Sequence, residues 1–149
     1  MLAEGGNAFD AAIAVAAVEG VTIPMMCGLG GEVFAILYHA QSGRIVGING
    51  SGAAATGATA EFYRRKGYAR MPLEGPLSVA VPGEVDAWET ILKLFGSRPL
   101  ARLLEPAIGY AEAGYPIPPK LAPNFARDAK KLAAFECSAE IFLNKGRPY

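Results

Sequence analysis

The order of apolar and polar residues predicts a chain in which helices and strands are mixed. Residues 8–19 are apolar around the whole helical circumference, so we expect a buried helix that Asn7 caps and Gly20 ends. Residues 33–39 and 44–49 are short apolar runs on either side of a glycine-containing turn, which predicts an antiparallel hairpin.

The pattern that follows predicts further helices with one short strand between them. A short helix is expected after Thr59, and the weak alternation of residues 77–81 favours a strand. Pro82 and Gly83 should open a helix that runs to about Phe95, with one apolar stripe made by Val85, Trp88, Leu92 and Phe95. The acidic residues of the same helix are expected on its solvent side: Glu84, Asp86 and Glu89.

The last third of the chain predicts three helical segments. Ser97 should cap the first, Pro106 should begin the second and Gly114 should end it, while Pro119 opens the last. This mixture of strands and helices excludes an all-β sandwich and a helical bundle, and it predicts an α+β fold.

Composition narrows the class of protein without identifying its chemistry. The 149 residues suit one domain, and 52% hydrophobic with 19% charged residues exclude a globally disordered chain. Lys and Arg number 14, as do Asp and Glu, so no nucleic-acid partner and no membrane surface is predicted. The longest apolar run is shorter than the about 20 residues of a membrane span. Two cysteines and one histidine predict no disulfide scaffold, metal site or cofactor.

Residues able to catalyse a reaction are scarce. His39 is the one imidazole, and its place beside the hairpin turn predicts exposure rather than membership of a catalytic triad. The Gly28–Gly31 segment could offer backbone N–H groups to an anion, but it has neither the P-loop nor the dinucleotide-binding spelling, so close backbone packing is favoured. Taken by themselves, these residues predict a mixed α/β protein of unassigned function.

Four segments stand out by their spelling and their spacing. They are GGNAFDAAIA at Gly5–Ala14, CGLGGEVF at Cys27–Phe34, VAVPGEV at Val79–Val85, and the pair LEPAI and AEAGYP within Leu104–Pro116. In this order they resemble the GGNA-x-DAA, SG-x-GG, VPG and L-x-PAI-x-x-A-x-x-G-[FY]-P segments of the gamma-glutamyltranspeptidase family, in its large subunit. The resemblance extends over nearly the whole chain, from about Glu4 onwards.

That resemblance implies part of the αββα sandwich of the N-terminal-nucleophile hydrolases, in which two stacked sheets lie between helical layers. The family precursor cleaves itself, and the threonine exposed at the start of the small subunit acts as nucleophile and, through its α-amine, as base. It attacks a γ-glutamyl or related amide, as in glutathione metabolism, and the acyl group passes to water or an acceptor amine. The expected partners are therefore a small subunit with the catalytic threonine and a small-molecule amide substrate.

The family's Thr-Thr-His-type nucleophile motif is absent from this sequence, as is the strand that precedes GGNA in the family. We therefore interpret residues 1–149 as a single partial domain, a large-subunit segment without the family's N-terminal strand or its small subunit. We expect this chain to contain no catalytic residue and to be inactive alone. The sequence assigns no cellular compartment.

The residues expected to bind the substrate are Asn49, Ser51, Gly52 and Ala53. Family members that bind γ-glutamyl groups have an arginine after the hairpin, and Ser51 aligns with that arginine. The acylase branch reads N-G-S-G-R-AP, which this chain follows through Gly52 before placing Ala53 at the arginine. Losing a bidentate charged contact costs about 1.5–3 kcal/mol of binding, so γ-glutamyl specificity is not expected. Arg44 is a weak substitute, because it lies at the far end of the strand.

Three hypotheses remain open at this point. The leading one is an amidohydrolase segment that acts on a non-glutamyl or acyl amide. The second is a non-catalytic remnant that serves as a binding or structural module, and the third is an independent anion-binding domain built on Gly28–Gly31. A sheet without its neighbours leaves apolar faces and edges open, so we expect the chain to pair with a second chain or to form an oligomer.

Overall fold

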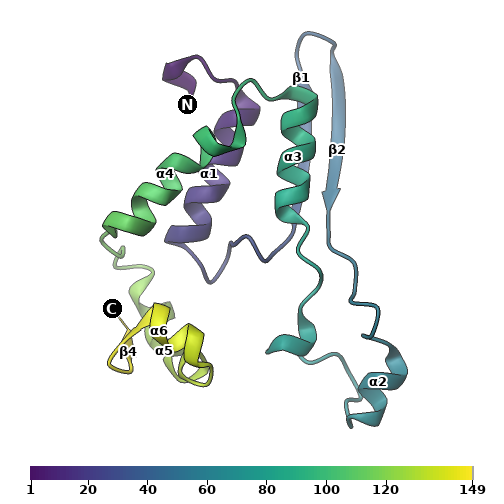
Figure 1. The fold of residues 1–149 in the computed structure, drawn as a ribbon, viewed down its shortest axis with the longest axis vertical. Coiled ribbons are helices and arrows are strands. Elements are labelled where there is room, and N and C mark those ends of the chain that lie inside the picture. The colour runs from purple at the N-terminus through teal and green to yellow at the C-terminus, as the bar shows by residue number, and fades with distance from the viewer. Residues whose placement is uncertain (149) are drawn as a thin grey trace.

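Figure 1 shows the helices and strands of residues 1–148, the part of the chain that the computed structural model describes. The first half contains α1 (Ala8–Thr22), β1 (Val33–His39), β2 (Arg44–Gly50) and α2 (Ala60–Arg65). The second half contains α3 (Glu84–Phe95), α4 (Leu100–Ala113), α5 (Ala122–Ala133), α6 (Glu136–Phe142), β3 (Leu143–Asn144) and β4 (Arg147–Pro148). Short 3-10 turns occupy Leu2–Glu4 and Pro76–Ser78. The predicted mixture of helices and strands is confirmed.

The hydrophobic core lies where α1, α3 and α4 meet one face of the hairpin. α1 packs along α4, while α3 lies against both strands of the hairpin (Figure 1). Leu103 is completely buried, and Ile13 and Trp88 each expose only 2% of their surface. The strands contribute their inward-facing residues to this core: Val33, Ala35, Leu37 and Ile48.

The predicted hairpin is confirmed, and only one of its faces is covered. β1 and β2 pair antiparallel, from Val33 opposite Gly50 to His39 opposite Arg44. Side chains alternate between the two faces of a strand, so every second residue points away from the helices. That outer face is apolar and exposed, and its large side chains are Phe34, Ile36, Tyr38 and Ile45.

A network of hydrogen bonds joins the start of α1 to the turn between α3 and α4. Asn7 Oδ1 accepts from the N–H groups of Phe9 and Asp10, and Asp10 Oδ2 accepts from the Asn7 N–H at 2.9 Å, which completes a capping box. The fully buried Asp10 carboxylate also accepts from the Ser97 N–H at 2.9 Å, the Ser97 hydroxyl and the Arg98 N–H at 3.3 Å. The Asn7 and Asp10 side chains of the GGNA-x-D segment therefore join the start of α1 to the turn between α3 and α4.

The end of α1 differs from the expectation. The helix continues past Gly20 to Thr22. The following loop passes close to the helix at this point, since a Cβ on Gly20 would lie at an ordinary contact distance of 3.5 Å from the Gly28 Cα. The helix is also not buried on every side, because Val15 is 56% exposed. The Tyr115 hydroxyl donates to the Thr22 carbonyl at 2.8 Å and so caps the helix end.

α3 begins and ends as predicted. The prediction that Glu84 lies on its solvent side was wrong. Glu84 is buried, with 7% of its surface exposed, whereas Val85 is 40% exposed. The start of the helix is hydrogen-bonded to Gly31 of the loop that precedes β1, and this loop covers the Glu84 side chain. The predicted strand at residues 77–81 is also wrong, because this segment holds a 3-10 turn and extended backbone.

α4 is one continuous helix, where two segments were expected. Pro106 lies inside it on an exposed side, so water can reach the carbonyl group that the proline leaves without an N–H donor. The helix ends before Gly114, which has a φ of 74°, as predicted. Ser97 does not cap α4, because its hydroxyl binds Asp10 and Pro99 occupies the cap position.

The C-terminal residues form a small unit beside the ends of α1 and α4 (Figure 1). α5 packs against α6 and against the two-stranded β3–β4 ribbon. A salt bridge of 2.7 Å between Lys131 and Glu74 connects α5 to the loop after α2. Within residues 1–148, no helix combines the length and the apolar character needed to cross a bilayer.

Candidate functional site

Three glycine-containing segments meet at one end of the hairpin. They are the loop before β1 (28–31), the segment after β2 (51–53) and the segment that leads into the first residue of α3 (81–84). The Val81 N–H donates to the Ala53 carbonyl at 2.9 Å, and the Gly83 N–H donates to the Gly31 carbonyl at 3.1 Å. We call this arrangement the glycine junction. It places the substrate-binding residues predicted from the sequence beside the family-like VPG segment.

Close backbone contact explains why glycines occupy the junction. A Cβ on Gly52 would overlap the Val81 carbonyl oxygen, and a Cβ on Gly83 would overlap the Gly50 carbonyl oxygen. A Cβ on Gly50 would lie 2.6 Å from the Ala87 Cβ, which is also too close. Any larger residue at these positions would push the segments apart.

The predicted substrate-binding residues lie on the accessible side of the junction. Asn49, Ser51 and Ala53 are exposed, and Gly52 is half-buried beneath them. Asn49 Oδ1 accepts a hydrogen bond from the Ser51 N–H at 3.0 Å, which turns the chain directly after β2. This bond occupies the Asn49 amide oxygen, and no hydrogen bond within residues 1–148 is made by the Asn49 NH₂ group.

The loop before β1 is joined to the start of α3 through Gly31. The Gly31 carbonyl accepts from the N–H groups of Gly83 at 3.1 Å and Glu84 at 3.2 Å, while its own N–H donates to the Gly28 carbonyl at 2.9 Å. Gly28 also packs against Gly20 of α1. Close packing explains Gly31, because a Cβ there would lie 3.0 Å from the Gly28 carbonyl oxygen, whereas a Cβ on Gly28 or Gly30 would meet no atom within 4 Å.

The arginine alternative considered for substrate binding lies far from the junction. Arg44 is paired with His39 at the opposite end of the hairpin from Gly50. Six residue steps along a strand span about 20 Å, so Arg44 is distant from Ser51 and Ala53. Neither of those two residues has a charged side chain, so the segment itself offers no cation to an acyl carboxylate.

Other reactive side chains do not converge on the junction to form a recognisable catalytic set. His39 is half-buried rather than exposed, because it packs on Phe95 with 5.1 Å between ring centroids, and its Nδ1 lies 2.8 Å from the Ser42 hydroxyl. Burial raises the pKa of Cys27, and the neighbouring carboxylates of Glu19 and Glu84 raise it further. A thiol with a raised pKa is a poor nucleophile. Residues 1–148 contain no group of three His, Cys, Asp or Glu side chains suited to a metal.

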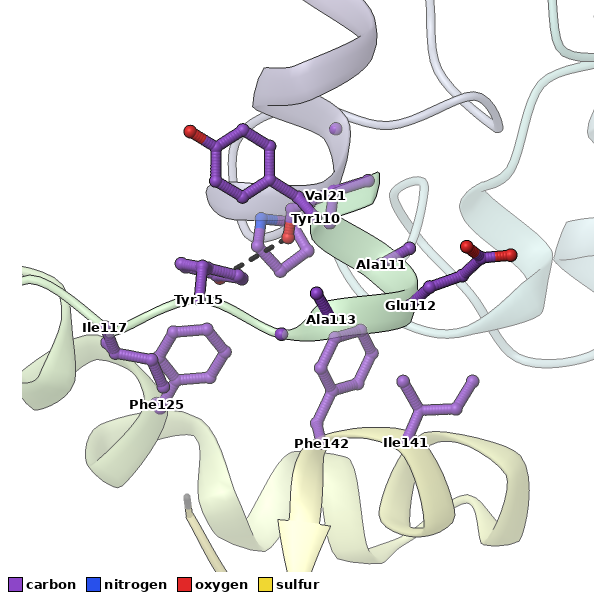
Figure 2. Close-up of a pocket in the computed structure, with 13 residues that line it drawn as sticks. Val21, Tyr110, Ala111, Glu112, Ala113, Tyr115, Ile117, Phe125, Ile141 and Phe142 are labelled. Atoms are coloured by element: carbon purple, nitrogen blue, oxygen red, sulfur yellow. Dashed lines mark hydrogen bonds between the residues drawn. The ribbon is translucent and has the colours of Figure 1, made fainter. Parts of the chain in front are cut away.

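A cavity of about 710 Å³ lies elsewhere, between the ends of α1 and α4 and the C-terminal unit. Figure 2 shows Tyr115 between Val21 and Phe125, with Phe142 and Ile141 facing the cavity from the C-terminal unit. The dashed line in that view runs from the Tyr115 hydroxyl to the Val21 carbonyl, at 3.4 Å. None of the predicted substrate-binding residues lines this cavity.

The cavity was not foreseen from the sequence, since its walls come from distant segments. Its lining is mainly apolar and aromatic, and Glu112 is its charged member. The AEAGYP segment gives a partial signal, because a helix ended by glycine and followed by Tyr-Pro indicates a sharp change of direction. We regard the glycine junction as the candidate functional site, because it brings the predicted polar residues together.

Known proteins match this chain over almost its whole length. Residues 1–149 match the family model described as Gamma-glutamyltranspeptidase. A glutathione hydrolase-like YwrD proenzyme of Bacillus subtilis is 38% identical over 148 residues, covering 99% of this chain and 28% of that relative. Helicobacter pylori gamma-glutamyltranspeptidase superposes with a TM-score of 0.92 at 32% identity, covering 99% of this chain and 43% of that one. A cephalosporin acylase from Bacillus halodurans superposes with a TM-score of 0.91 at 38% identity, covering 99% and 28%.

The relatives are much longer than this chain. The chain is matched almost completely, yet it spans only 28% of the Bacillus subtilis relative and 43% of the Helicobacter pylori chain. The superpositions therefore relate this chain to one part of those larger proteins.

Proposed function

The chain belongs to the gamma-glutamyltranspeptidase family, as its four segments suggested, and we propose that it forms the large-subunit portion of an amidohydrolase or acyltransferase. In this proposal it is one partial domain of the αββα sandwich. The threonine nucleophile lies outside residues 1–149, and this chain supplies scaffold and one wall of the substrate pocket. The high TM-scores to a transpeptidase and to an acylase support this assignment.

The partner that we propose is a small subunit with the catalytic threonine. The uncovered hairpin face supports such a partner, because Phe34, Ile36 and Tyr38 expose 67%, 86% and 62% of their surfaces. Contiguous apolar surface of this kind marks an interaction site. In the proposed sandwich the second sheet packs on this face, while α1 and α3 already cover the other.

The substrate that we propose is an acyl amide without a γ-glutamyl group. The observation that carries this proposal is the accessible Asn49–Ala53 segment, which is held by backbone contacts and has no charged side chain. It can donate and accept hydrogen bonds through Asn49, Ser51 and backbone groups. It cannot form the bidentate ion pair that a guanidinium offers to a carboxylate.

The experiment is to produce the chain together with a complementary small subunit and to measure amide hydrolysis. The substrates are a γ-glutamyl anilide, a glutaryl anilide and an oxamate-like amide. We expect kcat/KM to favour an amide other than the γ-glutamyl substrate. A strong preference for the γ-glutamyl anilide would overturn the proposed specificity, and no turnover by any pair would favour the non-catalytic alternative.

A substitution tests the role of the segment directly. Ser51→Arg restores the cation, and a charged bidentate contact of about 1.5–3 kcal/mol corresponds to roughly a 10- to 150-fold gain in kcat/KM for the γ-glutamyl anilide. Thr56→Arg is the matched control, because it adds the same charge outside the segment. Equal gains from both variants would show that Ser51 does not line the substrate site.

Pairing is tested on the hairpin face. Ile36→Lys should abolish co-purification with the small subunit, because it places a charge in the middle of the apolar face. Gln41→Lys, in the exposed hairpin turn, is the control and should leave pairing intact. Sedimentation of the chain alone as a stable monomer would count against the expected association.

A further inference from the structure

An aromatic side chain lies beside the first of the predicted substrate-binding residues. Phe34 of β1 is paired with Asn49 of β2. Directly opposed residues of an antiparallel pair share one face of the sheet, with their Cβ atoms about 4.5–5.5 Å apart. The Phe34 side chain is 67% exposed, so an apolar ring is accessible next to the Asn49 amide, where the uncovered hairpin face meets the glycine junction.

Two exposed valines lie beside the last of these residues. The Val81 N–H donates to the Ala53 carbonyl at 2.9 Å, and a Cβ on Gly52 would overlap the Val81 carbonyl oxygen, so the two segments run side by side. Val81 is 53% exposed, and Val79, two residues earlier, is 61% exposed. Accessible hydrocarbon therefore flanks the Asn49–Ala53 segment at both of its ends.

The charged residues of the segments around the junction have one sign. Residues 28–34, 49–55 and 79–87 contain no Lys, Arg or His, whereas they contain Glu32, Glu84 and Asp86. Glu32 is exposed and directly precedes Val33, which is paired with Gly50, so it lies next to the start of the 51–53 segment. An acyl group with a carboxylate would meet like charge here and no counter-charge.

The cations that flank these segments along the chain lie elsewhere. Arg44 is at the opposite end of the hairpin from Gly50. Arg64 and Arg65 are in the last turn of α2, which Figure 1 shows well away from the end of β2. Lys93, in the last turn of α3, is paired with Glu89 at 2.8 Å. These side chains are not placed to balance a carboxylate bound at the junction.

We infer that the substrate is the amide of a neutral, apolar acyl group, whose hydrocarbon packs on Phe34, Val79 and Val81. This inference rests on the proposed function and narrows its substrate class, because it disfavours every acyl group that bears a carboxylate, glutaryl included. Each CH₂ group that leaves water favours binding roughly fourfold, and the like charge at Glu32 opposes an anionic acyl group.

The experiment gives the pair of this chain and its small subunit two anilides of the same shape. Glutaryl anilide ends in a carboxylate, and 5-methylhexanoyl anilide has an isopropyl group in its place. We expect kcat/KM to be at least about 10-fold higher for the 5-methylhexanoyl anilide, because its two methyl groups leave water and meet no charge. Equal kcat/KM values, or a preference for glutaryl anilide, would overturn the inference while the proposed amidohydrolase activity stands.

Two substitutions test whether the preference arises at the junction. Val81→Thr keeps the side-chain shape and should lower kcat/KM for the 5-methylhexanoyl anilide about 3- to 10-fold, with glutaryl anilide unaffected. Val15→Thr is its matched control, because Val15 is 56% exposed in the middle of α1, outside the three segments. Glu32→Gln should raise kcat/KM for glutaryl anilide about 2- to 5-fold, and the exposed Glu140→Gln on α6 is its control. Variants that behave like their controls would overturn the inference.

A second measurement separates this inference from the proposed function. A pair that hydrolyses none of the amides would refute the proposed catalytic role. The two anilides are then titrated into that inactive pair, and the NMR chemical shifts of the backbone amides of residues 51 and 53 are followed. Larger shifts with the 5-methylhexanoyl anilide than with glutaryl anilide would support an apolar acyl site. No shifts with either anilide, or larger shifts with glutaryl anilide, would overturn it.

Discussion

Removal of the Asp10 carboxylate is the most direct test of how this fold is held together. Asp10 is completely buried, and it joins the start of α1 to the turn that separates α3 from α4. Asp10→Ala removes the acceptor of four hydrogen bonds, donated by the N–H of Asn7, the N–H and hydroxyl of Ser97 and the N–H of Arg98. The donors stay behind in a site that water reaches poorly.

The expected loss of stability follows from those contacts. A hydrogen bond to a charged group contributes about 1.5–3 kcal/mol, and the four bonds share one carboxylate, so they are not additive. Removing one side of a buried charged network costs about 3–5 kcal/mol. We therefore expect Asp10→Ala to lower the free energy of unfolding by about 3–5 kcal/mol, a large part of the about 5–15 kcal/mol of a typical domain. Asp10→Asn keeps the shape and one acceptor oxygen, so its loss should be smaller.

The assay is urea unfolding followed by tryptophan fluorescence, because Trp88 lies in the core beside α1 and α4. Asp86→Ala is the control, since it removes an exposed carboxylate from the first turn of α3 and should cost under about 1 kcal/mol. A loss below about 1 kcal/mol for Asp10→Ala would refute the view that this network holds the helices together.

The pH dependence gives an independent check on Asp10. Burial by itself would raise the pKa of this carboxyl, but hydrogen bonds from Ser97, Asn7 and Arg98 outweigh burial and lower the pKa below its ordinary value. A lowered pKa in the folded state means that the contribution of Asp10 is present above the unfolded-state pKa and is lost as pH falls through the folded-state pKa. The unchanged protein should therefore lose more stability in acid than Asp10→Asn. Parallel acid profiles would contradict this assignment.

Two further substitutions test the junction and the end of α1. Gly52→Ala should destabilise the protein and disrupt the junction, because its Cβ would overlap a backbone carbonyl, whereas Gly57→Ala points into open space and should change urea unfolding little. Equal effects of the two would contradict the close contact. Tyr115→Phe should cost about 0.5–1.5 kcal/mol, because it removes the hydroxyl that donates to the Thr22 carbonyl. Tyr110→Phe removes an exposed hydroxyl and should be neutral in the same measurement.

Local signals in the sequence were sufficient where neighbouring residues alone decide the structure. The hairpin was predicted closely, because two apolar runs and a glycine turn specify antiparallel pairing. The Asn7 capping box and the Thr59 cap were also predictable, since each forms between residues within one helical turn. The family was predictable because four characteristic sequence segments occur in a fixed order along the chain.

Contacts between distant segments decided what local patterns could not. Periodicity put Glu84 on the solvent side, but the loop ending at Gly31 packs over that side of α3 and buries it. Gly20 was expected to stop α1, yet the helix continues to Thr22. Pro106 lies within one helix because its exposed side tolerates a missing hydrogen bond. The cavity at Tyr115 likewise depends on the placement of the C-terminal unit.

The sequence by itself thus determined the hairpin, the Asn7 and Thr59 caps and the family, because these depend on local geometry and on residue order. Only the tertiary structure decided which polar groups are buried and which glycines are needed for close contact. Burial and close approach depend on segments that the chain brings together from far apart, and no local pattern contains that information.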